Sequence, residues 1–212
     1  MTTKTITLSN GKPYTVRSNR DRFFFPNEWI AFKKAIRPEY FHIFEVLINT
    51  GSRINEARNI KPSDIDFVNR RLTLRVTKVK ARKGEKNPRP RIIPISTEFC
   101  KYLSKYIKQN KIAPDSFILT ISTPGANQLL KRGLIRASIT DWKAFSIHNI
   151  RKTFEMWLLA LGIDSLKVTA HVGHSMQVAA GSYISADVLS HDEKLLIRQI
   201  LGDLYIDSLR RY

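Results

Sequence analysis

The spacing of apolar residues along the chain predicts a mostly helical protein. Apolar positions recur at intervals of three and four residues, and proline, glycine or a polar capping residue marks most segment ends. In the segment nearest the carboxyl end, Ile197, Ile200, Leu201 and Leu204 fall on one side. Helices are expected over residues 26–36, 38–50, 53–60, 97–107, 126–134, 147–161, 164–170 and 195–209.

One part of the chain alternates with a period of two instead. Leu72, Leu74 and Val76 are separated by polar residues, and residues 91–95 form a second short apolar run. Between them, residues 78–89 are strongly basic and contain glycine and proline, as expected of a long hairpin tip. The expected class is therefore α+β and mostly helical, with a small antiparallel β-sheet or hairpin packed on a helical core.

The pattern divides the chain into an arm and one domain. Residues 1–21 are polar with a turn signal at 11–13, so we expect an arm that is either disordered or a weak hairpin. After residue 22 there is no linker-like stretch, and 190 residues suit a single core. We expect one domain over 22–212, in which 184–212 form a C-terminal tail helix.

The net charge indicates more about function than the rest of the composition does. The 212 residues include 36 Lys and Arg against 18 Asp and Glu, a formal net charge of +18. Such a surface attracts polyanions, of which the phosphate backbone of nucleic acid is the usual one. There is a single cysteine, no Cys-rich zinc spacing, no apolar run long enough to cross a membrane and no signal peptide at the start. We expect a cytoplasmic protein without a membrane partner.

Several residues could bind a phosphate group. Arg53 follows Gly51-Ser52 at a helix start, where a guanidinium beside free amides makes an anion site. His148 and Arg151 are three residues apart and share one helical face. Each motif alone is common in proteins and indicates little.

Two further residues raise other possibilities. His171 and His174 are also three apart, but no third ligand has suitable spacing, so no metal is expected. Tyr183 follows the small residues 179–182, which would let a mobile segment bring its phenol to a phosphate. Tyr205 and Tyr212 are later tyrosines at other intervals from His174.

In this order and at these intervals the motifs resemble the catalytic domain of the tyrosine recombinase (phage integrase) family. The resemblance runs from about Arg22 to Tyr183. Four stretches carry it: residues 50–57 (TGSRINEA), 64–66 (DID), 147–154 (IHNIRKTF) and 172–175 (VGHS). The nine-residue interval between His174 and Tyr183 adds to them.

The resemblance implies a role for each matching residue. Arg53 and Arg151 would hold the non-bridging oxygens of the scissile phosphate, and Glu56 would orient the arginines. His174 would donate to the same phosphoryl group. His148 would assist and accept the phenolic proton, and Tyr183 would form a 3′-phosphotyrosine.

The resemblance also implies a hairpin lysine that protonates the leaving 5′-oxygen. Strand parity favours Lys80, which continues the series Leu72, Leu74 and Val76, and Lys83 beside Gly84 comes second. The other basic residues of the tip would contact DNA phosphates: Lys78, Arg82, Lys83, Lys86 and Arg89.

The implied function is site-specific cleavage and rejoining of double-stranded DNA, by four protomers on two duplexes, without metal, ATP or another cofactor. A prokaryotic mobile element or virus is the expected source. Alternatives are a type IB topoisomerase-like or telomere-resolving enzyme, and a DNA-binding module that has lost cleavage. Residues 179–182 (AAGS) depart from the family's usual threonines.

Most full-length members have a further DNA-binding domain before the catalytic one. Only about 20 residues precede the match here, which predicts either a catalytic fragment or a short recombinase, with weak and strongly salt-dependent DNA binding. The tail after Tyr183 would pack on its own domain or dock on a neighbouring protomer, and Tyr183 would act in cis or in trans.

Overall fold

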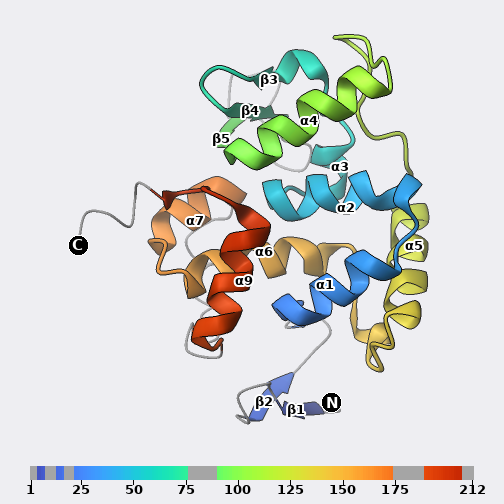
Figure 1. Cartoon of the computed structure of the whole chain (residues 1–212), viewed down its shortest axis with the longest axis vertical. Coiled ribbons are helices and arrows are strands. Elements are labelled where there is room, and N and C mark those ends of the chain that lie inside the picture. Colours follow the sequence, from blue (N-terminus) through green and yellow to red (C-terminus); the bar gives the residue numbers. More distant parts are fainter. Residues whose placement is uncertain (1–3, 8–12, 17–21, 76–89, 174–188, 207–212) are drawn as a thin grey trace, which may run out of the picture.

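The computed structural model describes residues 4–7, 13–16, 22–75, 90–173 and 189–206. Helices dominate it, with a small sheet at one end of the long axis and a two-stranded hairpin at the other (Figure 1). The helices are α1 (Pro26–Ala35), α2 (Pro38–Thr50), α3 (Ile54–Ala57), α4 (Thr97–Gln109), α5 (Thr123–Arg136), α6 (His148–Ala160), α7 (Ser165–Val172) and α9 (His191–Leu201), with 3-10 turns η1 (Pro62–Asp64) and η2 (Trp142–Ala144). The strands are β1 (Lys4–Thr7), β2 (Pro13–Val16), β3 (Ile65–Asp66), β4 (Arg71–Leu74) and β5 (Arg91–Pro94).

The predicted fold class is confirmed. The sheet is antiparallel in the order β3-β4-β5, and Leu72 pairs with Ile93. Leu72 and Leu74 are fully buried while Arg71 is exposed, as the alternation predicted. Val76 and the hairpin tip lie outside the described residues.

Helix α6 is the centre of the fold. It contacts α2, α7 and α9, and nearly all of its side chains are buried. An aromatic cluster packs against one side, where the Trp29 and Trp157 rings meet edge-on at 6.3 Å. Trp157 Nε1 donates to the Phe24 carbonyl at 3.0 Å, and Phe24 N donates to Thr153 Oγ1 at 2.9 Å. These bonds fix the chain before α1 on the central helix.

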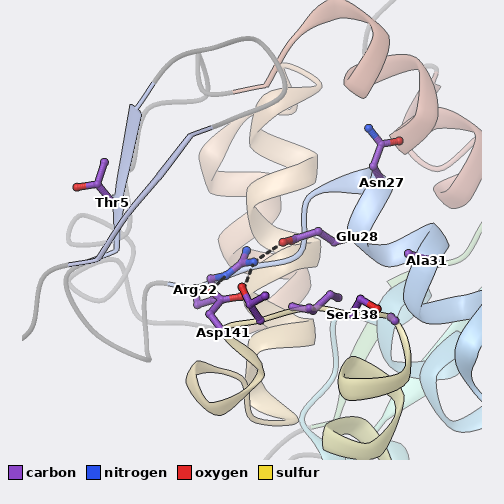
Figure 2. A pocket seen from close by; sticks show the side chains of 10 residues that line it. Thr5, Arg22, Asn27, Glu28, Ala31, Ser138 and Asp141 are labelled. Carbon is purple, nitrogen blue, oxygen red and sulfur yellow. Dashed lines mark hydrogen bonds and ion pairs between the residues drawn. The ribbon is translucent and has the colours of Figure 1, made fainter.

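The chain enters this core at a buried arginine. The Arg22 side chain is 1% exposed and pairs with both Glu28 and Asp141, the latter at 2.8 Å from Nε (Figure 2). Its guanidinium also lies over the Phe145 ring, 4.5 Å from the centroid. A cavity of about 570 Å³ beside it is bordered by Thr5 of β1, so the hairpin adjoins the start of the helical core (Figure 2).

Three predicted helices differ from the structure by three or more residues at an end. One of them was expected over 126–134, but α5 already begins at Thr123. Another was expected over 53–60, but α3 has four residues and the chain turns before η1. The last was expected over 195–209, whereas α9 begins after Ser190, which caps it through Glu193 N at 3.2 Å, and ends at Gly202. The expectation followed the apolar stripe and missed the capping box S-x-x-E at 190–193.

The described part of the tail packs on its own chain as far as Tyr205. Ile197, Leu201 and Leu204 are at most 3% exposed, and α9 contacts α1 and α6. The sequence left open whether the tail packs on its own domain or docks on a neighbouring protomer. In the structure, these three apolar side chains are buried against their own chain. Within the described ranges, no helix is both long and apolar enough to cross a bilayer.

Candidate active site

A sharp turn between α2 and α3 forms the floor of the site. Gly51 ends α2 with φ of +56°, a left-handed conformation that favours glycine. A Cβ at Gly51 would collide with the Phe154 ring of α6. Glycine therefore lets this turn press directly against the central helix and places Arg53 at the start of α3.

Arg151 of α6 is held beneath the turn. Its side chain is 1% exposed, and Nη1 donates to the Gly51 carbonyl at 2.9 Å while Nη2 donates to the Val172 carbonyl. Its Nε lies 3.3 Å from Glu155 Oε1 but outside hydrogen-bond geometry. Burial, and next the positive charge of Arg53, lower the pKa of Arg151 to about 10, so it remains charged at neutral pH.

Glu56 joins three arginines at one fully buried carboxylate. Oε1 accepts from Arg53 Nη1 at 2.9 Å, and Oε2 accepts from Arg91 Nη2 at 3.1 Å and lies 3.9 Å from Arg151 Nη1. Burial by itself would raise the pKa of Glu56, but the hydrogen bond from Arg53 N and the charge of Arg91 outweigh it and lower the pKa. Glu56 is thus ionised and orients the guanidiniums.

Arg91 is the residue that the sequence reasoning missed. It was assigned only to the start of a strand, yet its side chain is 12% exposed and reaches Glu56 from β5. Arg91 shares strand parity with the buried Ile93 and Ile95. An arginine on the apolar face of a predicted strand is the sequence signal that could have identified Arg91 as part of the site.

His148 and Arg53 open into the same cavity. His148 is exposed at the first position of α6, and the Arg53 side chain is 20% exposed. The cavity measures about 260 Å³ and is lined by Ser52, Arg53, Ile54, Asn55, Thr123, Ile147 and His148. The two predicted motifs, nearly 100 residues apart in sequence, therefore meet at one opening.

The arginine cluster carries excess positive charge. The three guanidiniums of Arg53, Arg91 and Arg151 face two carboxylates, Glu56 and Glu155, which leaves one net positive charge. Burial raises the pKa of Glu155, which weakens its contribution as a counter-charge. A partly buried, uncompensated guanidinium cluster is suited to binding an anion such as phosphate.

The remaining predicted site residues lie outside the described part of the chain. These are Lys80, His174, Tyr183 and the DNA-contacting set Lys78, Arg82, Lys83, Lys86 and Arg89. The last described residue before His174 is Gly173, which ends α7 with φ of +71°. A Cβ at Gly173 would collide with the Arg91 guanidinium, so the chain leaves α7 directly beside the cluster.

Both ring nitrogens of His171 are engaged in hydrogen bonds inside the protein. His171 is buried, with Nε2 3.1 Å from the Thr50 carbonyl and Nδ1 2.7 Å from the Tyr205 hydroxyl. Burial lowers its pKa to about 3, so the ring is neutral. Since a carbonyl only accepts, Nε2 carries the proton and Nδ1 accepts from Tyr205. Among the residues with described positions, no three His, Cys, Asp or Glu side chains are grouped to hold a metal ion.

Tyr205 is occupied by this contact. Burial raises the pKa of its phenol to about 12, and its backbone has φ of +61°, which is unfavourable for a bulky residue. The segment after α9 is therefore held in a strained conformation that places its hydroxyl on His171.

The buried neutral histidine predicts a specific pH dependence. In the unfolded chain His171 protonates near pH 6.5, whereas in the folded chain it does so near pH 3. Its contribution to stability is complete above pH 6.5 and is lost as the pH falls toward 3. Between about pH 6 and pH 4, unfolding should take up about one more proton in the wild type than in His171→Gln, which retains a donor and an acceptor. Urea titrations across this range measure the difference, and parallel pH profiles would contradict it.

Comparison with known proteins agrees with the geometry. The family model for the phage integrase family matches residues 29–188. The tyrosine recombinase XerH of Campylobacter jejuni is 29% identical over 168 residues, which cover 76% of this chain and 44% of that relative. The chain thus spans less than half of that relative's length.

Solved structures with the same fold include recombinases. The XerA recombinase superposes with a TM-score of 0.60 at 22% identity, covering 90% of this chain and 66% of that one. The Tn1549 transposon integrase in complex with a circular intermediate DNA superposes with a TM-score of 0.64 at 16% identity, covering 91% and 66%. Because the family model covers most of the chain, the protein belongs to the phage integrase family of tyrosine recombinases.

Proposed function

We propose that this chain is the catalytic domain of a site-specific DNA recombinase or integrase that cleaves and rejoins strands through a 3′-phosphotyrosine. The observation that carries the proposal is the convergence of Arg53, Arg91 and Arg151 on the buried Glu56, beside a cavity that also contains His148. Such a site can bind and stabilise a phosphodiester without a metal ion.

Arg53 and Arg151 would hold the non-bridging oxygens of the scissile phosphate. Arg151 donates one hydrogen of Nη1 to the Gly51 carbonyl and one of Nη2 to the Val172 carbonyl, which fixes the plane of its guanidinium. Its other N–H groups would then be left to bind the phosphate. A donor that is already oriented stabilises the developing negative charge without reorganising during the reaction.

The covalent step would combine His148 with Lys80, His174 and Tyr183. The Tyr183 phenol passes its proton to His148 and attacks phosphorus, forming the tyrosine–phosphate bond. The bond from phosphorus to the 5′-oxygen breaks, and Lys80 protonates that oxygen while His174 donates to the phosphoryl group. Rejoining reverses these transfers, so the phosphodiester energy is retained and no ATP is needed.

Double-stranded DNA is the proposed substrate, and assembly of four protomers on two sites is part of the proposal. A net charge of +18 supports the first point. Solved relatives support it as well, since XerH is described bound to its difH substrate and the Tn1549 integrase in complex with transposon right end DNA. The latter also supports a role in the movement of a mobile element.

A suicide-substrate assay tests the proposed function. Nicked duplex DNA carrying the candidate target site should form a covalent adduct with the wild type on a denaturing gel, and none with Tyr183→Phe. An adduct that persists in Tyr183→Phe would place the nucleophile elsewhere. Intact DNA binding without any adduct would favour a binding module of the same fold.

A further inference from the structure

A second cavity adjoins the first beside α3. The first is lined by Arg53 and His148, as described above. The second, of about 490 Å³, is lined by Asn55, Arg58, Asn59, Phe117, Leu119 and Thr120. Both are lined by Asn55, so the two cavities adjoin at this residue, and together they are here called the α3 groove.

The lining of the α3 groove offers donors and no negative charge. No Asp or Glu lines either cavity. Arg58 follows α3 in helical conformation, and no carboxylate of the described residues pairs with it. Thr123 Oγ1 donates to Asn55 Oδ1 at 3.2 Å, so the Asn55 amide nitrogen is directed away from that bond. An anion would meet attraction along the whole groove.

An aromatic ring lines the second cavity of the groove. Phe117 is 49% exposed, although most large apolar side chains of the protein are in the core. The Lys61 ammonium lies 5.5 Å from the centre of its ring. A basic surface that includes an exposed aromatic ring matches the alternation of charge and apolar sugar along a nucleic-acid strand.

We propose that the α3 groove binds the sugar–phosphate backbone next to the scissile phosphate, with Arg58 on a phosphate and Phe117 against a deoxyribose. The inference rests on the proposed function, because the groove begins at the predicted phosphate site. Arg58 comes five positions after Arg53, with the four residues of α3 between them, which corresponds to a rise of about 7 Å. Nucleotides of one strand are about 3.4 Å apart along the duplex axis, so the groove reaches about two nucleotides beyond the site.

Salt dependence of binding measures the contribution of Arg58. For the full chain and a short non-specific duplex, the plot of log K against log salt should be less steep by about 0.9 in Arg58→Ala, because one phosphate contact is lost. Arg136→Ala is the matched control: this exposed arginine lies at the other end of α5, about 20 Å from Thr123 along the helix. It should keep the wild-type slope.

Phe117→Ala separates the apolar contact from the charge. It should weaken binding at every salt concentration while leaving the slope unchanged, since no charge is removed. Thermal unfolding midpoints close to the wild type would show that both variants are folded.

If Arg58→Ala kept the wild-type slope of log K against log salt, the proposal that the α3 groove binds DNA would be wrong. It would also be wrong if Arg58→Ala and Arg136→Ala reduced that slope equally. These binding measurements do not depend on cleavage. If the wild type forms no covalent adduct but Arg58→Ala has a less steep slope, DNA binding in the α3 groove is supported and the proposed recombinase chemistry is contradicted. If the adduct forms and Arg58→Ala keeps the wild-type slope, only the proposal for the α3 groove is contradicted.

Discussion

Replacement of Arg151 by lysine is expected to lower the rate of DNA strand cleavage by about 10³-fold. Lysine keeps the charge but is a point donor, and it cannot reach both the Gly51 and Val172 carbonyls while also facing a phosphate. The loss should fall on the rate at saturating protein, because the missing hydrogen bonds strengthen as charge develops in the transition state.

Single-turnover formation of the covalent adduct measures this effect. Arg132→Lys, an exposed arginine of α5, is the matched control and should react at the wild-type rate. If Arg151→Lys cleaved within tenfold of the wild type, Arg151 would not be the principal donor to the phosphate, and Arg53 or Arg91 would have to take that role.

Replacement of Glu56 by alanine is expected to destabilise the folded protein by about 3–5 kcal/mol. The carboxylate is fully buried and contacts Arg53, Arg91 and Arg151, so its removal leaves guanidiniums close together without their shared counter-charge. Chemical denaturation measures the change in the free energy of unfolding.

Glu39→Ala is the matched control for Glu56→Ala. Its pair with Arg37 is 4.0 Å long and both side chains are exposed, so a loss of less than about 1 kcal/mol is expected. Glu56→Gln adds a pH test. Because the pKa of Glu56 is lowered, its contribution is present above the ordinary glutamate value of 4.5 and is lost below it. The stability gap between wild type and Glu56→Gln should therefore narrow in acid, and a constant gap would contradict the assignment.

The sequence was informative at several helix ends, where local chemistry decides the structure. Gly51 ends α2 and Asp164 caps α7 through Leu166 N at 2.9 Å, both as the pattern indicated. Helix ends depend on residues within one turn of each other, so they can be read from a short window. The pairing of Arg53 with the His148 and Arg151 motif was predicted by resemblance to a family.

Long-range contacts could not be read in this way. Arg91 reaches Glu56 across 35 positions and Tyr205 reaches His171 across 34, and the sequence does not show which residue either side chain contacts. The error in the last helix had a different cause. The apolar stripe continues past Gly202 to Leu204, and burial in a turn gives the same pattern as burial on a helix.

The bond between Tyr205 and His171 sets a boundary for protein engineering. A chain cut after Leu201 would keep α9 complete, yet it would lose the hydroxyl that satisfies His171 and the Asp203 carboxylate that accepts from Thr97 N at 2.7 Å. The imidazole rests on the carbonyl of Thr50, next to the turn that holds Arg151. Minimal or split versions of this domain should therefore end beyond Tyr205, and fusion partners are best attached after Ile206.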